Sequence, residues 1–115
     1  MAKVKLERIK SFGVDVVIQG EESGQAELYA QKMSQEDGYY YISPYNDSEV
    51  IAGQGTIALE ILEQMKGRSL DNLFISIGGG GLISGISAVI QHHSPATKIW
   101  RVSAINSCTL ADSIK

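Results

Sequence analysis

Hydrophobic and polar residues follow two different periods along the first third of the chain. Residues 2–12 and 24–36 carry apolar side chains three or four positions apart, which predicts two amphipathic helices. The β-branched run at 14–18 and the aromatic run at 39–42 each predict a short strand. This part of the chain is therefore predicted to fold in the order helix, strand, helix, strand.

The remainder of the chain repeats this alternation between helical and strand periods. A polar stretch that contains Pro44 predicts a loop at 43–49. The elements predicted after it are a helix at 56–66, a strand at 73–77, a helix at 82–92 and a strand at 98–103, followed by one helical turn or a frayed end at 109–114. Strands that alternate with helices predict an α/β fold, with an open and mostly parallel sheet flanked by helices, in one domain over residues 1–115.

The composition narrows the class of protein. The 115 residues are 43% apolar and 20% charged, which is ordinary for one compact globular domain. The net charge is −3, whereas nucleic-acid-binding proteins usually carry an excess of basic residues. No apolar run in the sequence has the length of a membrane span. Cys108 is the only cysteine, which excludes an internal disulfide and a cysteine metal cluster. We expect a cytoplasmic protein that binds neither nucleic acid nor a membrane and has no metal site.

Four consecutive glycines, Gly78 to Gly81, stand between the strand predicted at 73–77 and the helix that begins at Leu82. Consecutive glycines allow several backbone N–H groups to point toward one place, and the helix adds the positive end of its dipole. Together these features predict a cradle for an anion, most naturally a phosphate group. The alternative is a tight turn from strand to helix with close packing.

Established phosphate and nucleophile motifs do not match this loop. The Rossmann pattern G-x-G-x-x-G fails because Ile83 or Ser84 stands at its last glycine. The Walker A pattern lacks its Gly-Lys pair, and the G-x-S-x-G nucleophile motif lacks both glycines around Ser84. A phosphate cradle at this loop would therefore belong to another class of cofactor.

A second glycine motif at 51–56 reads Ile-Ala-Gly-Gln-Gly-Thr. Taken alone, it indicates flexible glycines before a helix whose N-cap is Thr56. Taken with the first motif, it points to a family. Residues 43–62, SPYNDSEVIAGQGTIALEIL, and residues 77–86, IGGGGLISGI, resemble the fold-type II pyridoxal-phosphate enzymes, and most closely the threonine/serine dehydratases and serine racemases. Tyr45 and Asn46 stand where that family has Phe and Asp.

The resemblance implies a fold and a cofactor. It implies that residues 1–42 correspond to part of the family's small domain and residues 43–115 to part of its large domain. It also implies pyridoxal phosphate, whose phosphate is held in the family by backbone amides of a glycine loop. The residues that match this loop are Gly78, Gly79, Gly80, Gly81 and Leu82. Residues 53–56 match the loop and helix start of the family motif that residues 43–62 resemble, and the resemblance assigns no individual role to them.

Three family motifs have no match in this chain, one of them the late Gly-rich motif whose Ser or Cys contacts the pyridine nitrogen in the family. The Schiff-base lysine of the family lies in a Ser-Phe-Lys motif, whereas Lys10, Ser11 and Phe12 occur in another order. Ser103 and Ala104 replace the Glu-Pro pair that precedes a cation site in the family. We therefore expect a fragment-like relative of the dehydratase lyases that has no catalytic residue of its own and no catalysis alone. The alternative is a non-catalytic protein that binds a small phosphate-bearing ligand or forms homo-oligomers, most simply dimers.

Overall fold

The computed structural model describes residues 3–21 and 23–105. The chain divides into two compact units, a first unit up to Tyr41 and a second unit from Ile42 onward. Cys108 and the helical turn predicted at 109–114 lie outside the described residues. Among the helices that the structure describes, none combines the length and apolar character needed to cross a bilayer.

The described residues of the first unit form two helices, α1 (Lys3–Lys10) and α2 (Ser23–Asp37). Both agree with the helices predicted there. The segment after α2 is tied back to that helix, because the Tyr41 hydroxyl donates a hydrogen bond to Glu27 Oε1 at 3.1 Å. The strands predicted at 14–18 and 39–42 are wrong, since both segments lack regular secondary structure. A β-branched or aromatic run forms a strand only where another strand satisfies its backbone groups.

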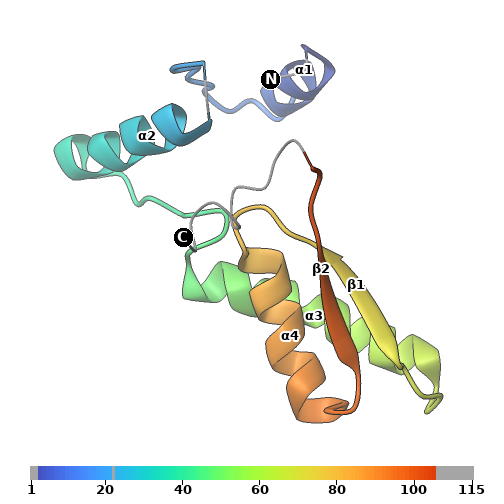
Figure 1. The fold of residues 1–115 in the computed structure, drawn as a ribbon. Helices are drawn as coiled ribbons and strands as arrows, with labels where there is room; N and C mark the ends of the chain where they lie inside the picture. The colour runs from blue at the N-terminus through green and yellow to red at the C-terminus, as the bar shows by residue number, and fades with distance from the viewer. Residues whose placement is uncertain (1–2, 22, 106–115) are drawn as a thin grey trace. The chain divides into compact units, whose positions relative to one another are not determined.

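In its described part, residues 42–105, the second unit contains two helices and a two-stranded parallel sheet (Figure 1). Its elements in chain order are α3 (Ser48–Met65), β1 (Asn72–Ser76), α4 (Gly81–His93) and β2 (Lys98–Val102). The register pairs Asn72 with Lys98 at one end of the sheet and Ser76 with Val102 at the other. Parallel strands joined by a helix make a β–α–β unit, so the predicted α/β class with a parallel sheet is confirmed.

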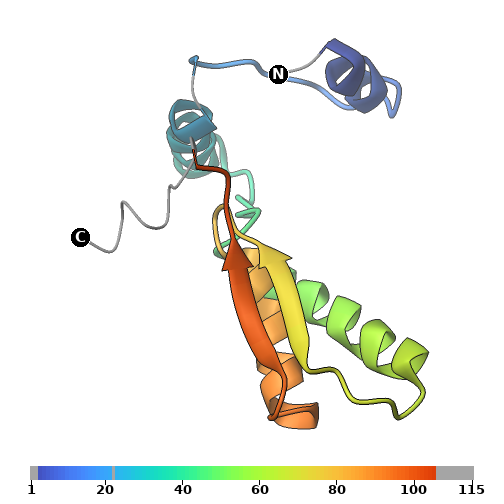
Figure 2. The ribbon, with the colours of Figure 1, turned by 45° about the vertical axis from the view of Figure 1, so that its right-hand side comes forward.

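The core of the second unit lies between the two helices and one face of the sheet. Figure 2 shows α4 behind the two strands, and α4 packs against both α3 and β1. Helix α3 and strand β1 each contribute one buried apolar residue and α4 contributes two: Ala58, Ile75, Ile86 and Ile90. Parallel sheets are stable when helices cover their faces, and here the helices cover one face.

Helix α3 begins eight residues earlier than predicted, at Ser48 instead of Thr56. Asp47 is its N-cap, and the carboxylate oxygen Oδ1 accepts hydrogen bonds from the N–H groups of Glu49 at 2.9 Å and Val50 at 3.1 Å. These bonds satisfy two of the donors that every helix start leaves without partners. Thr56 is therefore not the cap, and the loop predicted at 43–49 is shorter than expected.

Candidate functional site

The glycine loop begins where β1 ends. The N–H of Ile77 donates to the carbonyl oxygen of Val102 at 2.9 Å, which keeps the exit of β1 next to the end of β2. The chain then turns through three glycines and enters α4 at Gly81. Gly80 is the N-cap of this helix, with φ 95° and ψ −14°. That left-handed conformation is readily adopted by glycine and strained for other residues, so the turn requires glycine at this position.

The start of α4 presents backbone N–H groups without a capping side chain. Gly80 offers none, and the hydrogen bonds that build the helix begin with the Ser84 N–H, 3.0 Å from Gly80 O. The N–H groups of residues 81–83 precede this bond, and first-turn N–H groups have no partner inside their own helix. The 13-residue helix also places the positive end of its dipole here. This combination favours binding of a phosphate group.

Alternate glycines of the loop face different surroundings. A β-carbon added at Gly78 or Gly80 would meet no atom within 4 Å. A β-carbon at Gly79 would overlap the Tyr45 ring, and one at Gly81 would lie 2.8 Å from Tyr45 Cα. The loop is therefore open at two positions and closely packed at the other two. The open positions leave the space that a phosphate group needs to approach the backbone, so the residues fit such a ligand.

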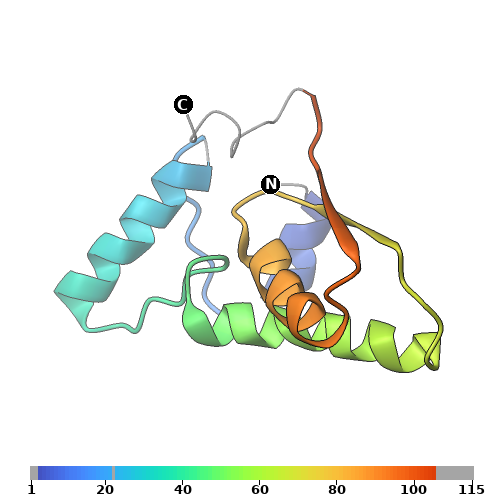
Figure 3. The same ribbon diagram turned by 60° about the horizontal axis from the view of Figure 1, so that its bottom comes forward.

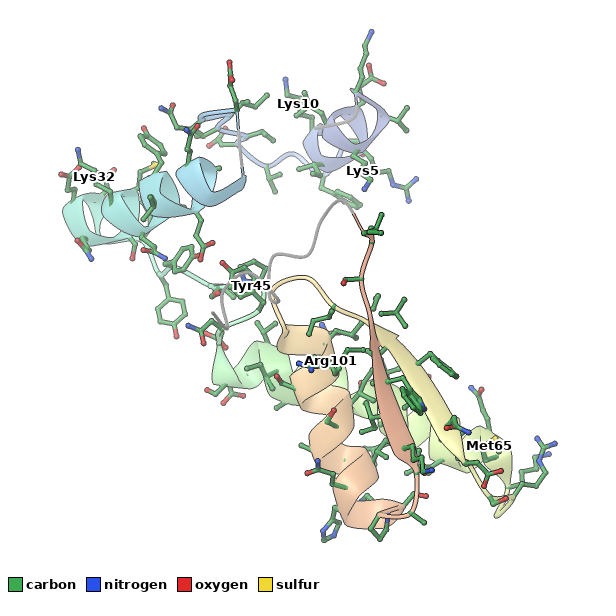
Figure 4. The ribbon with its side chains drawn as sticks, in the orientation of Figure 1. Lys5, Lys10, Lys32, Tyr45, Met65 and Arg101 are labelled. Carbon is green, nitrogen blue, oxygen red and sulfur yellow. The ribbon has the colours of Figure 1, made fainter. Side chains whose placement is uncertain are left out.

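The predicted site residues 78–82 are consecutive and form the end of the loop and the first two residues of α4, with Leu82 following Gly81 in the helix. The Leu82 side chain is half-buried and packs against the core of the second unit. Tyr45 is the neighbour of the loop that sequence reasoning missed, and Figure 4 shows its side chain beside the loop. The sequence shows Tyr45 only as an aromatic residue within the 43–62 stretch. A single sequence does not indicate which distant residues an aromatic ring will contact, so the contact with the loop could not be predicted.

The glycine motif at 51–56 was predicted to form a loop before a helix, but its glycines lie within α3 and one of them packs against α4. Residues 53–56 lie inside α3. Gly55 is buried where α3 meets α4, and a β-carbon there would lie 3.2 Å from Gly85 O. In the opposite direction, a β-carbon at Gly85 would lie 2.7 Å from Gly55 N. Figure 3 shows α4 crossing α3, and these two glycines allow the backbones to approach at that crossing.

Comparison with protein families matches residues 1–115 to the pyridoxal-phosphate dependent enzymes. The chain belongs to this family. Among curated relatives, it is 39% identical to the biosynthetic L-threonine dehydratase of Burkholderia multivorans, over 98% of this chain and 23% of that protein. It is 38% identical to the chloroplastic biosynthetic threonine dehydratase of Arabidopsis thaliana, over 97% of this chain and 19% of that protein. The chain thus spans about a fifth to a quarter of these relatives.

Solved structures of pyridoxal-phosphate dependent enzymes share the fold. A pyridoxal 5'-phosphate-dependent aspartate racemase aligns with a TM-score of 0.80 and 34% identity, over 88% of this chain and 30% of the other. The processed form of threonine deaminase isoform 2 from Solanum lycopersicum aligns with a TM-score of 0.78 and 38% identity, over 88% of this chain and 27% of the other. The predicted relation to the dehydratase and racemase group of this family is confirmed.

A pyridoxal-phosphate dependent enzyme needs a lysine near the phosphate loop, and the second unit has two described lysines. Lys98 begins β2 and pairs with Asn72, at the end of the sheet opposite the loop. At about 3.3 Å per residue, the four steps from Asn72 to Ser76 separate the two ends of the strand by roughly 13 Å. Lys66 is the C-cap of α3, an 18-residue helix of roughly 27 Å. Lys98 therefore lies at the end of the sheet opposite the glycine loop, and Lys66 lies at the C-terminal end of α3.

No cluster of three or more metal-binding side chains occurs among the residues that the structure describes.

Proposed function

We propose that this chain supplies the phosphate-binding part of a pyridoxal-phosphate site of the dehydratase type, and that it does not catalyse a reaction by itself. One observation carries the proposal. The glycine loop is open at Gly78 and Gly80, immediately before the uncapped start of α4. Backbone N–H groups and a helix dipole that converge on such an opening bind phosphate without any basic side chain.

The residues would hold the cofactor through its phosphate. The N–H groups of Gly78 to Leu82 would donate hydrogen bonds to phosphate oxygens, and these bonds fix the position and orientation of the group. Pyridoxal phosphate supplies, when bound, the electron sink that β-elimination from serine or threonine requires. The chain's own contribution is binding and orientation.

The positions of the two described lysines of the second unit support the proposal that the chain alone does not catalyse a reaction. Lys66 and Lys98 lie at the far ends of α3 and the sheet. In the first unit, Lys10 stands before Ser11 and Phe12, whereas the Schiff-base lysine of the family follows Ser and Phe. Covalent catalysis requires a lysine positioned at the cofactor. We propose that a complete site takes this lysine from residues outside this chain.

Titration with pyridoxal phosphate tests this function. We expect a saturable absorbance change that inorganic phosphate reverses by competition. Borohydride reduction followed by intact-mass and peptide analysis should find no single lysine modified stoichiometrically. Gly80→Val should abolish saturable binding, because the side chain is strained at φ 95° and fills the open side of the loop.

Gly53→Ala is the matched control, since it changes a glycine in open space within α3 and should bind like the unmodified chain. Absence of saturable binding, or equal binding by Gly80→Val, would rule out the phosphate site. Stoichiometric modification of one lysine would instead contradict the proposal that the chain does not catalyse a reaction by itself.

A second proposed function, self-association, is favoured by the uncovered face of the sheet. We define the aromatic face as Phe74, Trp100 and Val102, whose exposed fractions are 68%, 49% and 49%. The rings of Phe74 and Trp100 stack with centroids 6.2 Å apart. The described sheet also has two strands, so each strand has one edge without a partner in that sheet. Apolar faces and unpaired edges are common sites of association between chains.

We expect the chain to dimerise through the aromatic face. Sedimentation at increasing protein concentration should show a dimer, and Phe74→Thr should weaken dimerisation about tenfold or more, because aromatic residues dominate interface energies. Threonine keeps the preference for a strand at this position. Tyr40→Thr, which changes a residue that is 83% exposed in the first unit, is the control. A monomer at all concentrations, or dissociation caused by Tyr40→Thr instead, would rule out this surface.

A further inference from the structure

Tyr45 occupies the space beside two of the four glycines in the loop. A β-carbon at Gly79 would overlap ring atoms of Tyr45 and lie 2.8 Å from its Cβ. A β-carbon at Gly81 would lie 2.8 Å from Tyr45 Cα and 3.1 Å from Tyr45 O. Both the ring and the backbone of Tyr45 therefore contact the loop. The contact joins residues 34 or more positions apart in sequence, so local chain geometry does not produce it.

The backbone on both sides of Tyr45 is held in place. Ser43 is 7% exposed, and its hydroxyl oxygen accepts a hydrogen bond from the Asn46 N–H at 3.0 Å. Asp47 follows and caps α3 through the N–H of Val50 at 3.1 Å. A hydrogen-bonded turn that begins at the buried Ser43 and a capped helix start thus hold the segment that carries Tyr45. The glycine loop is the softer partner of the contact, because glycine has the largest backbone freedom of any residue.

We propose that Tyr45 is a positioning residue for the Gly78–Gly81 loop, an inference that rests on the phosphate-binding function proposed above. Its ring and backbone occupy one side of Gly79 and Gly81 and leave Gly78 and Gly80 open. This restricts the loop to an arrangement in which its N–H groups converge. A loop of four glycines without this contact has to lose its freedom when the ligand binds, and that entropy loss weakens affinity.

Affinity for inorganic phosphate, measured by calorimetry on the full chain, tests the inference. Tyr45→Phe keeps the ring and should bind phosphate within about twofold of the unmodified chain. Tyr45→Ala removes the ring and should bind about tenfold more weakly. Met65→Ala is the matched control, because it removes a half-buried side chain at the opposite end of α3, as Figure 4 shows. It should lower stability without changing phosphate affinity.

Two results would overturn the inference. One is phosphate binding by Tyr45→Ala as tight as that of the unmodified chain, and the other is equal weakening by Tyr45→Ala and Met65→Ala. If the unmodified chain binds no phosphate, the proposed function fails, and the urea midpoint then decides the role of Tyr45. Gly79→Ala should lower the midpoint less in the Tyr45→Ala background than alone, and equal shifts would show that Tyr45 does not position the loop.

Discussion

Replacement of Gly85 by alanine is expected to lower the free energy of unfolding of the second unit by about 3 kcal/mol, the upper part of the usual range for overpacking. A β-carbon at Gly85 would overlap the carbonyl oxygen of Ile51 and lie 2.7 Å from the nitrogen of Gly55. Both atoms belong to the backbone of α3, which cannot change rotamer to make room. The two helices would have to separate, and the contacts around the crossing would be lost.

Urea unfolding followed by fluorescence measures this change. Trp100 is the only tryptophan and lies in β2, so its emission reports on the second unit. Gly53→Ala is the control, because it makes the same chemical change in α3 at a place with no atom within 4 Å. Helix propensity predicts that this control stabilises the unit by about 1 kcal/mol. Equal effects of the two substitutions would contradict the close crossing of α3 and α4.

Replacement of Ile90 by alanine is expected to destabilise the second unit by about 3 to 4 kcal/mol. Ile90 is fully buried and belongs to the core between α4, α3 and the sheet. The substitution removes apolar contacts and leaves a cavity that close-packed neighbours fill only in part. Since a small domain is stable by only about 5 to 15 kcal/mol, much of the stability of this unit would be lost.

Ile57→Ala makes the same substitution on the exposed side of α3, where the residue is 39% accessible. Its effect should stay below about 1 kcal/mol, because less apolar area is lost and alanine is the better helix former. Thermal unfolding of both variants by circular dichroism gives the comparison. A loss at Ile57 as large as that at Ile90 would place the core of this unit elsewhere.

Both strands and helix α4 of the second unit could be predicted because each has a complete local pattern. The strands predicted at 73–77 and 98–103 correspond to β1 and β2, and the helix predicted at 82–92 corresponds to α4. The run at 14–18 has an equally good strand composition but lacks regular structure. Strand formation depends on a neighbour that satisfies backbone hydrogen bonds, and composition does not reveal whether that neighbour is present.

The glycines also show that local features could be predicted from the sequence, whereas tertiary contacts could not. The loop at 78–81 was predicted from four adjacent glycines between a strand and a helix, which is a local signal. The roles of Gly55 and Gly85 could not be predicted, because they depend on which helices cross and at which residues. Thr56 illustrates the same limit, since its hydroxyl donates to Gly53 O at 2.8 Å inside α3 instead of capping the helix.

The indole of Trp100 has a bearing on how the aromatic face is buried. Its Nε1–H donates a hydrogen bond to Asn72 Oδ1 at 2.8 Å, between the two strands of the same sheet. A buried indole N–H without a partner carries a desolvation penalty of a few kcal/mol, which any covering surface would otherwise have to offset with an acceptor of its own. Because Asn72 already provides that acceptor, a surface made only of hydrocarbon groups can cover Trp100 without leaving this polar group unsatisfied.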